Sequence, residues 1–228
     1  MSFIVIEGLD GSGKSTQIEL IKQYLTSKQI KFEYIHFPTN DSPIFGDMIS
    51  RFLRGDFGSL EQVHPNLVAL LFAGDRYNMA NTIRDWQSSG SLVINDRYVY
   101  SNIGFQCAKL KNVDEADKLF KWILDLEFNY YKIPQPDLSI FLDVPFEFTK
   151  KKLTQVRNGA DREYLEGKID IHEANLVFQN NVRNVYLKAV EKDANLMRID
   201  CSDKEGNMLN AEHISSMIIK EIKNRKLI

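Results

Sequence analysis

The amino-acid sequence predicts an α/β fold of three layers, in which helices cover both faces of a central, five-stranded parallel sheet. Short apolar segments typical of buried strands alternate along the chain with longer amphipathic segments typical of helices. The chain has 228 residues, of which 43% are hydrophobic, so it can bury a sizeable core. Because no linker, internal repeat or low-complexity tract divides it, we expect a single domain over residues 1–228.

The predicted strands are short apolar segments, of which FIVIE is the first. They occupy residues 3–7, 31–37, 91–96, 137–144 and 195–201. Ligands of such parallel sheets bind beyond the carboxyl ends of the strands. We therefore expect functional residues directly after these segments.

The predicted helices show apolar residues three and four positions apart, as Ile18, Ile21 and Leu25 are in the first helix. A Ser-Pro pair marks the start of the second helix and Gly55 marks its end. The helices are expected at residues 15–29, 42–55, 64–90, 100–110, 114–131, 145–157, 171–193 and 210–226. The polar segment at about 157–168 carries two glycines and both charge signs, and we expect it to form a mobile lid.

The charge of the chain is nearly balanced, with 29 basic and 31 acidic residues and a net charge of -2. This balance argues against a dedicated nucleic-acid surface and allows a local basic site for a small anion. The two cysteines, Cys107 and Cys201, form no C-x-x-C motif, and no leader is visible, so we expect a cytoplasmic protein. No segment approaches the roughly 20 apolar residues that span a membrane.

The segment GLDGSGKST follows the first predicted strand and opens the first predicted helix. Residues 8–15 match G-x-x-x-x-G-K-[ST], the phosphate-binding P-loop, in the strand-loop-helix context that the motif requires. Glycines let backbone N–H groups approach phosphate oxygens, and the helix N-terminus adds partial positive charge. The predicted nucleotide-binding residues are Gly8, Asp10, Gly11, Ser12, Gly13, Lys14, Ser15 and Thr16.

Within this loop, we expect Lys14 to reach the β- and γ-phosphates of ATP and Ser15 to bind Mg²⁺ through its hydroxyl. Thr16 can donate to a further phosphate. The third strand ends at Asp96, where a carboxylate can hold the water shell of the magnesium, and Arg97 follows it. An isolated Asp-Arg pair is commonly a surface ion pair, but the position beside a P-loop strand favours a guanidinium that clamps phosphate.

Residues 96–106, DRYVYSNIGFQ, resemble the signature of thymidylate kinases. The order of the other motifs is similar as well: GLDGSGKST, then FP at 37–38, then FAGDR at 72–76, then the signature, then a charged lid. The resemblance covers about the whole chain. It implies the nucleoside monophosphate kinase form of the P-loop NTPase fold.

In this family the acid at the position of Asp10 acts near the acceptor sugar and phosphate. A carboxylate inside a phosphate-binding loop is repelled by the ligand, which favours a functional reason for its presence. Asp10 can hold the sugar 3′-hydroxyl or orient a positive group on the acceptor phosphate. The resemblance implies that Phe72 stacks on thymine and that Arg76 donates to its O4, although the pattern around Phe72 also suits a core residue.

The remaining acceptor residues come from the signature and from the loop after the second strand. The resemblance places Asn102 where it could read a pyrimidine edge, and the ring of Phe105 where it would crowd a 2′-hydroxyl. Thr39 and Asn40 depart from many relatives, which carry Arg or Tyr there, so one contact to the acceptor is in doubt. The full set of implied acceptor-binding residues is Asp10, Phe37, Phe72, Arg76, Arg97, Ser101, Asn102, Phe105, Gln106 and Tyr164.

The lid is expected to supply an arginine, because Gly11 stands where one branch of the family has an arginine. Arg162 is our first choice for neutralising the transferring phosphoryl group, and Arg157 would lie over the adenine. Tyr164 resembles the lid tyrosine that lies near the acceptor in some members. The four histidines, His36, His64, His172 and His213, show no metal spacing and are interpreted as structural, and Glu173 as a helix-start carboxylate.

The resemblance thus predicts a homodimeric, Mg²⁺-dependent enzyme that transfers the γ-phosphoryl group of ATP to dTMP. Lys14, Arg97, Asp10 and Arg162 are its predicted catalytic residues. The helices at 67–86 and 101–110 could supply the dimer face or could belong to the core. The alternatives are a kinase of the same fold with another acceptor, and a P-loop ATPase or GTPase that acts on a partner protein. The absence of an N-K-x-D motif speaks against a GTPase.

Overall fold

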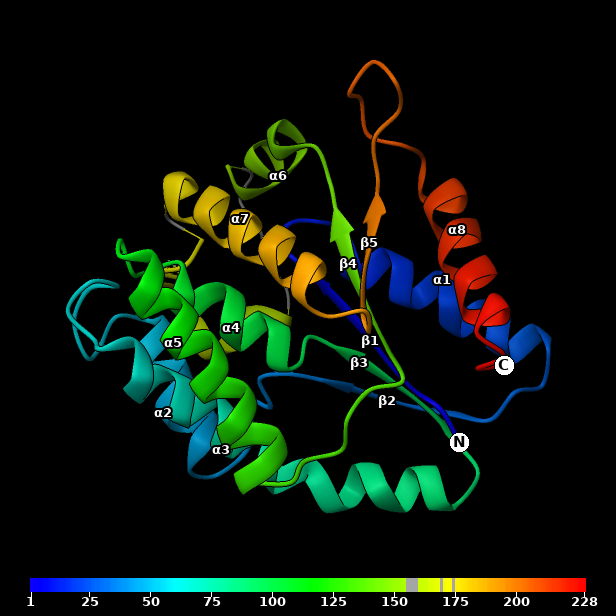
Figure 1. Ribbon diagram of the computed structural model, residues 1–228, viewed down its shortest axis with the longest axis horizontal. Coiled ribbons are helices and arrows are strands. Elements are labelled where there is room, and N and C mark those ends of the chain that lie inside the picture. The colour runs from blue at the N-terminus through cyan, green and yellow to red at the C-terminus, as the bar shows by residue number, and fades with distance from the viewer. Residues whose placement is uncertain (155–159, 169, 174) are drawn as a thin grey trace.

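The computed structural model describes residues 1–154, 160–168, 170–173 and 175–228 and contains the predicted five-stranded parallel sheet (Figure 1). The strand order is β2-β3-β1-β4-β5, and every neighbouring pair is parallel. The P-loop strand therefore lies at the centre, with β3 on one side and β4 on the other. The strands are β1 (Phe3–Gly8), β2 (Phe32–His36), β3 (Leu92–Asp96), β4 (Leu138–Asp143) and β5 (Leu196–Asp200).

Two separate cores explain why the central strand is apolar at consecutive positions. Phe3 and Val5 of β1 pack into one core, and Ile4 and Ile6 pack into the other, because successive side chains point to opposite faces of a sheet. Helices α1 and α8 cover the second core, whereas α2, α3, α4, α5 and α7 cover the first (Figure 1). The chain thus forms the predicted α/β/α layers.

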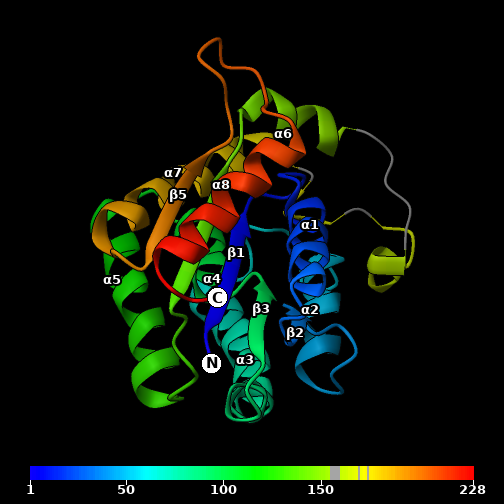
Figure 2. The same cartoon turned by 90° about the vertical axis from the view of Figure 1, so that its right-hand side faces the viewer.

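The helices largely match the predicted segments. They are α1 (Lys14–Ser27), α2 (Phe45–Leu53), α3 (Pro65–Ser88), α4 (Val99–Cys107), α5 (Val113–Leu124), α6 (Phe146–Leu153), α7 (Leu176–Lys192) and α8 (Ala211–Asn224). A π-helix, η1 (Asp125–Tyr130), continues α5, and a 3₁₀ helix, η2 (Ala160–Leu165), lies in the predicted lid. Figure 2 shows α6 beyond the carboxyl ends of the strands, where ligands of this fold bind.

One predicted helix boundary is wrong in a way that matters for the site. The helix expected from residue 171 begins at Leu176, because the side chain of Asn175 caps it by accepting a hydrogen bond from the backbone N–H of Phe178 at 2.9 Å. The preceding residues, Asp170 to Glu173, are therefore not helical. Asp170, His172 and Glu173 line the cavity described below.

Both cysteines are buried, Cys107 on α4 and Cys201 after β5, and neither forms a disulfide. Burial raises the pKa of each thiol to about 12. In the part of the chain that the structure describes, no helix has both the length and the apolar character needed to cross a lipid bilayer. The two termini lie close together, with the hydroxyl of Ser2 donating to the carbonyl of Leu227 at 3.0 Å (Figure 1).

Candidate active site

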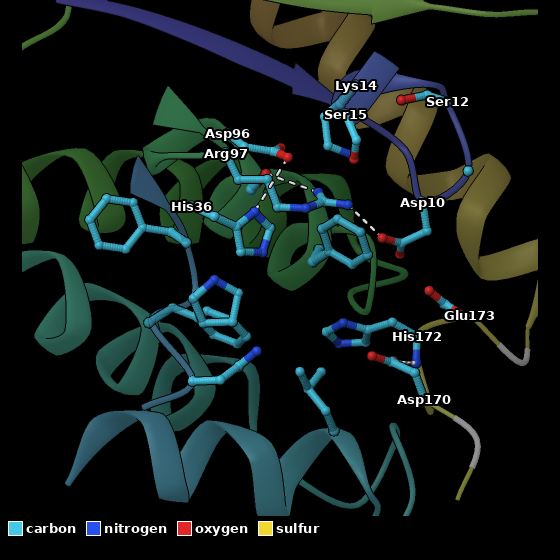
Figure 3. A pocket seen from close by; sticks show the side chains of 18 of the residues that line it. Asp10, Ser12, Lys14, Ser15, His36, Asp96, Arg97, Asp170, His172 and Glu173 are labelled. Atoms are coloured by element: carbon cyan, nitrogen blue, oxygen red, sulfur yellow. Dashed lines mark hydrogen bonds and ion pairs between the residues drawn. The ribbon is translucent and has the colours of Figure 1, made fainter. Parts of the chain in front are cut away.

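A cavity of about 640 Å³ opens at the carboxyl edge of the sheet, beside the P-loop and the residues that follow β2 and β3. Figure 3 shows Lys14, Asp96 and Arg97 on one side of it and Asp170 and His172 on the other. The structure brings most of the predicted site residues together around this cavity. Those that line it are Asp10, Gly11, Ser12, Gly13, Lys14, Ser15, Thr16, Phe37, Phe72, Arg76, Asp96, Arg97, Ser101, Asn102, Phe105, Gln106 and Tyr164.

The P-loop needs glycine at the positions where its backbone turns. Gly11 and Gly13 have φ values of 73° and 84°, in the left-handed region that side chains rarely adopt. Gly8 meets a different constraint, since a β-carbon there would lie 2.6 Å from the hydroxyl oxygen of Ser12. The hydroxyl-bearing residues Ser15 and Thr16 follow at the start of α1 and are exposed to the cavity. This geometry is that of a phosphate cradle at a helix N-terminus.

The side chain of Lys14 lies along the loop that it belongs to. Its ammonium group donates to the carbonyls of Leu9 at 3.0 Å and Gly8 at 3.3 Å. Burial lowers the pKa of Lys14 to about 8, and the nearby charge of Arg97 adds to this effect. The ammonium group is thus held at the cavity in a site where an anion would stabilise its charge.

Arg97 and Asp10 form an ion pair that joins the end of β3 to the P-loop (Figure 3). The guanidinium donates to a carboxylate oxygen of Asp10 at 2.5 Å, to the carbonyl of Gly8 at 3.0 Å and to the hydroxyl of Ser101 at 3.1 Å. Burial alone would raise the pKa of Asp10, but the charges of Arg97 and Lys14 outweigh it and lower that pKa to about 2. Asp10 is therefore an anion that orients the guanidinium of Arg97.

Asp96 is held at the end of β3 by His36, which ends β2. The imidazole Nδ1 lies 3.3 Å from one carboxylate oxygen of Asp96. The other oxygen is buried and has no hydrogen-bond partner among the described residues. Burial favours the neutral acid, but His36 and the charge of Lys14 outweigh it and lower the pKa of Asp96. A charged carboxylate with one free oxygen suits a cation or its bound water.

Arg76 also lines the cavity and pairs with a residue that sequence reasoning missed. Its guanidinium donates twice to Glu127 of η1, at 2.5 and 2.7 Å, and both side chains are buried. Asn102 donates to the same carboxylate and to the carbonyl of Ala69, each at 3.0 Å. This network fixes Arg76 and Asn102 side by side at the cavity wall. The amide oxygen of Asn102 has no partner among the described residues and is available to a ligand.

Aromatic side chains form the apolar part of the wall. Phe72 is half-buried against the core and also lines the cavity. Phe37 is buried beside Tyr98, with ring centroids 5.7 Å apart, and Phe105 lies 4.8 Å from the imidazole of His172. Gln106 is buried next to Phe105, with an amide oxygen that has no partner in the described part of the chain.

The loop after β2 explains the unusual Thr39 and Asn40. Thr39 donates to the buried carboxylate of Asp75 through its hydroxyl and through its backbone N–H, the latter at 2.8 Å. Its side chain is therefore committed to the protein and does not line the cavity. Asn40 does line it.

The lid residues are only partly described. Arg157 lies outside the described residues. Arg162 belongs to η2, but its side chain is outside what the structure describes. Tyr164 lines the cavity as expected, and its hydroxyl donates to Asp170 at 3.0 Å.

Sequence reasoning also missed residues that reach the site from distant parts of the chain. Gln179 of α7 donates to Asp10 at 2.9 Å and to the backbone carbonyl of His172 at 3.0 Å. His172 and Asp170, which precede α7, line the cavity, so the purely structural interpretation of His172 is incomplete. His36 likewise lines the cavity rather than serving only the core. The sequence signal for these residues was the pair of acids and the histidine at 170–173 (DIHE). We missed it because we assigned residues 171–173 to the start of a helix.

The arrangement places a phosphate cradle, a fixed arginine and an apolar pocket with amide groups around one space. It can hold a polyphosphate at the P-loop and a second, partly aromatic ligand near Phe72 and Asn102. Arg97 lines the same space and donates both to the carbonyl of Gly8 in the P-loop and to the hydroxyl of Ser101, the residue before Asn102. The chemistry that such a site supports is transfer of a phosphoryl group between the two ligands.

Comparison with known proteins agrees with this geometry. Residues 6–211 match the thymidylate kinase family. The chain is 29% identical over 226 residues to the probable thymidylate kinase of Methanosphaera stadtmanae, covering 97% of this chain and 99% of that protein. It is 32% identical over 202 residues to the thymidylate kinase of Francisella philomiragia, covering 88% and 90%.

The fold is similar to that of the thymidylate kinase of Candida albicans, with a TM-score of 0.71 and 23% identity, over 99% of this chain and 92% of that one. The match of the family profile spans most of the chain, from the P-loop to the start of α8. The chain belongs to the thymidylate kinase family.

Proposed function

We propose that this protein transfers the γ-phosphoryl group of ATP to dTMP, forming dTDP and ADP. An oxygen of the dTMP phosphate attacks the γ-phosphorus, and the bond from that phosphorus to the β,γ-bridging oxygen breaks as ADP leaves. The observation that carries the proposal is one cavity that is lined by the P-loop, by Arg97 and by the Arg76–Asn102 pair. The transition state is loose, so positioning and charge account for most of the catalysis.

On the donor side, the N–H groups of residues 11–16 would hold the β- and γ-phosphates. Lys14 would leave its two carbonyl partners for phosphate oxygens, and a bound phosphate would raise the pKa of its ammonium group again. Ser15 and Asp96 fit a magnesium site that is completed by phosphate oxygens and water. Such an ion would neutralise charge on the phosphates. The described residues contain no cluster of three or more metal-ligating side chains, so phosphate oxygens would be needed as ligands.

On the acceptor side, Phe72 would stack on the thymine, while Arg76 and the free amide oxygen of Asn102 would meet its polar edge. Phe105 and His172 close the cavity where the deoxyribose would lie, which leaves little room for a 2′-hydroxyl. Arg97 would hold the acceptor phosphate, with Asp10 keeping the guanidinium in place. Arg162 remains our choice for the lid arginine and Arg157 for the residue over adenine.

A coupled assay of ADP formation tests this function. With ATP and Mg²⁺, we expect turnover with dTMP to exceed that with dCMP, AMP and GMP, and thymidine to be a poor acceptor. Equal turnover with all monophosphates would contradict the proposal. Phosphorylation of thymidine would indicate a deoxynucleoside kinase, and nucleotide hydrolysis without any acceptor would indicate a P-loop ATPase or GTPase.

The protein is also proposed to act as a homodimer. Three large apolar side chains on one helix are exposed: Leu67, Leu70 and Tyr77 of α3. The second helix considered from the sequence does not qualify, because the residues of α4 are all buried within the protein. The α3 face is thus the better candidate for contact with a second copy.

A further inference from the structure

Glu7, the last residue before the P-loop, is a fully buried carboxylate without an ion-pair contact among the described residues. Its two oxygens instead accept four hydrogen bonds. The donors are the backbone N–H groups of Tyr98 at 2.9 Å and Ser101 at 3.3 Å, the hydroxyl of Ser101 at 2.6 Å and the hydroxyl of Tyr186 at 2.9 Å. A buried carboxylate is costly, and three of these four hydrogen bonds come from Tyr98 and Ser101, which closely follow Arg97.

The first consequence of these contacts concerns the backbone. Tyr98 is the N-cap residue of α4 but makes no side-chain cap, so Glu7 satisfies the N-terminal N–H groups of that helix from another strand. Arg97 itself has a φ of 67°, a left-handed conformation that is uncommon for a side-chain-bearing residue. The backbone N–H of Arg97 donates to Ile6 and the next one donates to Glu7. Adjacent residues of β1 thus hold the chain on both sides of this turn.

The second consequence concerns the guanidinium. Arg97 has only donors, so the Ser101 hydroxyl must accept its hydrogen bond. That hydroxyl can then use its one hydrogen to donate to Glu7, 2.6 Å away. Because the carboxylate of Glu7 can only accept, it fixes the donor-to-acceptor direction of the two linked hydrogen bonds, from Arg97 to Ser101 and from Ser101 to Glu7. Burial raises the pKa of Glu7, while the hydrogen bonds from Ser101 and Tyr186 and the charge of Arg97 oppose the rise.

We propose that Glu7 is a positioning residue for phosphoryl transfer: it holds Arg97 in its strained backbone conformation and aims its guanidinium through Ser101. The proposal rests on the proposed function, in which Arg97 holds the acceptor phosphate. Glu7 touches neither ligand. Its effect is on the placement of Arg97 between the P-loop and the acceptor end of the cavity.

The test is the kinetics of Glu7→Gln, which keeps the shape of the side chain but gives it an N–H₂ group. We expect kcat to fall on the order of 100-fold, as for a small misplacement of a catalytic group, while the KM for ATP stays within about threefold of the wild type. The matched control is Tyr100→Phe. Tyr100 lies on α4 like Ser101, but its hydroxyl donates to Asp193 and has no hydrogen bond to Arg97. We expect this control to retain the kcat of the wild type.

A double-mutant cycle separates positioning from general destabilisation. In an Arg97→Lys background, where the guanidinium is absent, Glu7→Gln should change kcat by no more than about twofold. If Glu7→Gln does not fold, Ser101→Ala breaks the same chain, and a loss of kcat, rather than a rise in the KM for dTMP, supports the proposal. An unchanged kcat, or the same loss in both backgrounds, would overturn it. A wild type that does not phosphorylate dTMP would instead refute the proposed function.

Discussion

Asp170 and His172 lie two positions apart at the cavity and have opposite pKa shifts. Burial raises the pKa of Asp170 to about 7, and the negative charges of Asp10 and Glu173 add to the rise. Burial lowers the pKa of His172 to about 3, and the charge of Lys109 contributes to the decrease. Both side chains are therefore neutral in the folded, ligand-free protein near pH 5 to 6, because this range lies above the pKa of His172 and below the pKa of Asp170.

These shifts predict opposing pH dependences of stability. Between about pH 4 and 7 the folded state keeps a proton on Asp170 that the unfolded state loses, so this residue makes stability fall as the pH rises. Between about pH 3 and 6.5 the unfolded state protonates His172 and the folded state does not, so this residue makes stability rise with pH. The two contributions offset each other in the wild type.

Asp170→Asn should therefore make the free energy of unfolding increase more steeply with pH than in the wild type, and His172→Phe should make it increase less steeply or fall. Urea denaturation at pH 4.5, 5.5 and 6.5 measures both slopes. Using the difference from the wild type at each pH removes the contribution of all other groups. Parallel curves for the three proteins would show that these residues titrate normally.

At the scale of elements, α3 carries Phe72 and Arg76 and is held against α2 at Gly74. A β-carbon at this position would overlap the ring of Phe45. Gly74→Ala should therefore destabilise the protein by about 1–3 kcal/mol, the usual cost of overpacking, despite the better helix propensity of alanine.

Urea denaturation measures this loss, and Asn78→Ala on the exposed side of the same helix is the control. The control should stay within about 0.5 kcal/mol of the wild type. The KM for dTMP should rise only in Gly74→Ala, because the shift of α3 moves the wall of the acceptor site. Equal stability of the two variants would show that Phe45 moves aside freely.

The elements that could be predicted from the sequence are those specified locally. The P-loop is continuous in the chain, so its motif and its strand-loop-helix context were enough to place Lys14 and Ser15. The partners of Arg76 and Asp10 were not predictable, because Glu127 lies 51 positions and Gln179 lies 169 positions away. The start of α7 was predicted too early because the helical spacing of apolar residues extends to positions before Asn175. The helix itself begins directly after Asn175, which is its N-cap.

At the scale of the whole molecule, the resemblance over the chain predicted the family and the sheet predicted the place of the cavity. The resemblance did not predict that residues outside the motifs, such as His36, Asp170 and His172, complete the wall of the cavity. These contacts depend on the packing of distant segments at the carboxyl edge. Which of these residues line the cavity can therefore be read only from the three-dimensional structure.

The proposed dimer gives a prediction at this scale. Leu67→Lys with Tyr77→Glu places two opposite charges on the exposed face of α3 and should yield a monomer in sedimentation experiments. Val177→Lys is the control, because Val177 is even more exposed than Leu67 and Tyr77 but lies on α7. The control should leave the mass of the particle unchanged. A dimer that survives the α3 substitutions must use another face.

The burial of both thiols has a practical consequence for watching the enzyme at work. Cys107 and Cys201 are the only cysteines in the chain, and at neutral pH their shielded thiols would react very slowly with maleimide reagents. A single cysteine introduced at the exposed Glu166, just after η2, would therefore take up one dye without any change to the native thiols. Its fluorescence would test in real time whether nucleotide binding moves the segment beside the cavity.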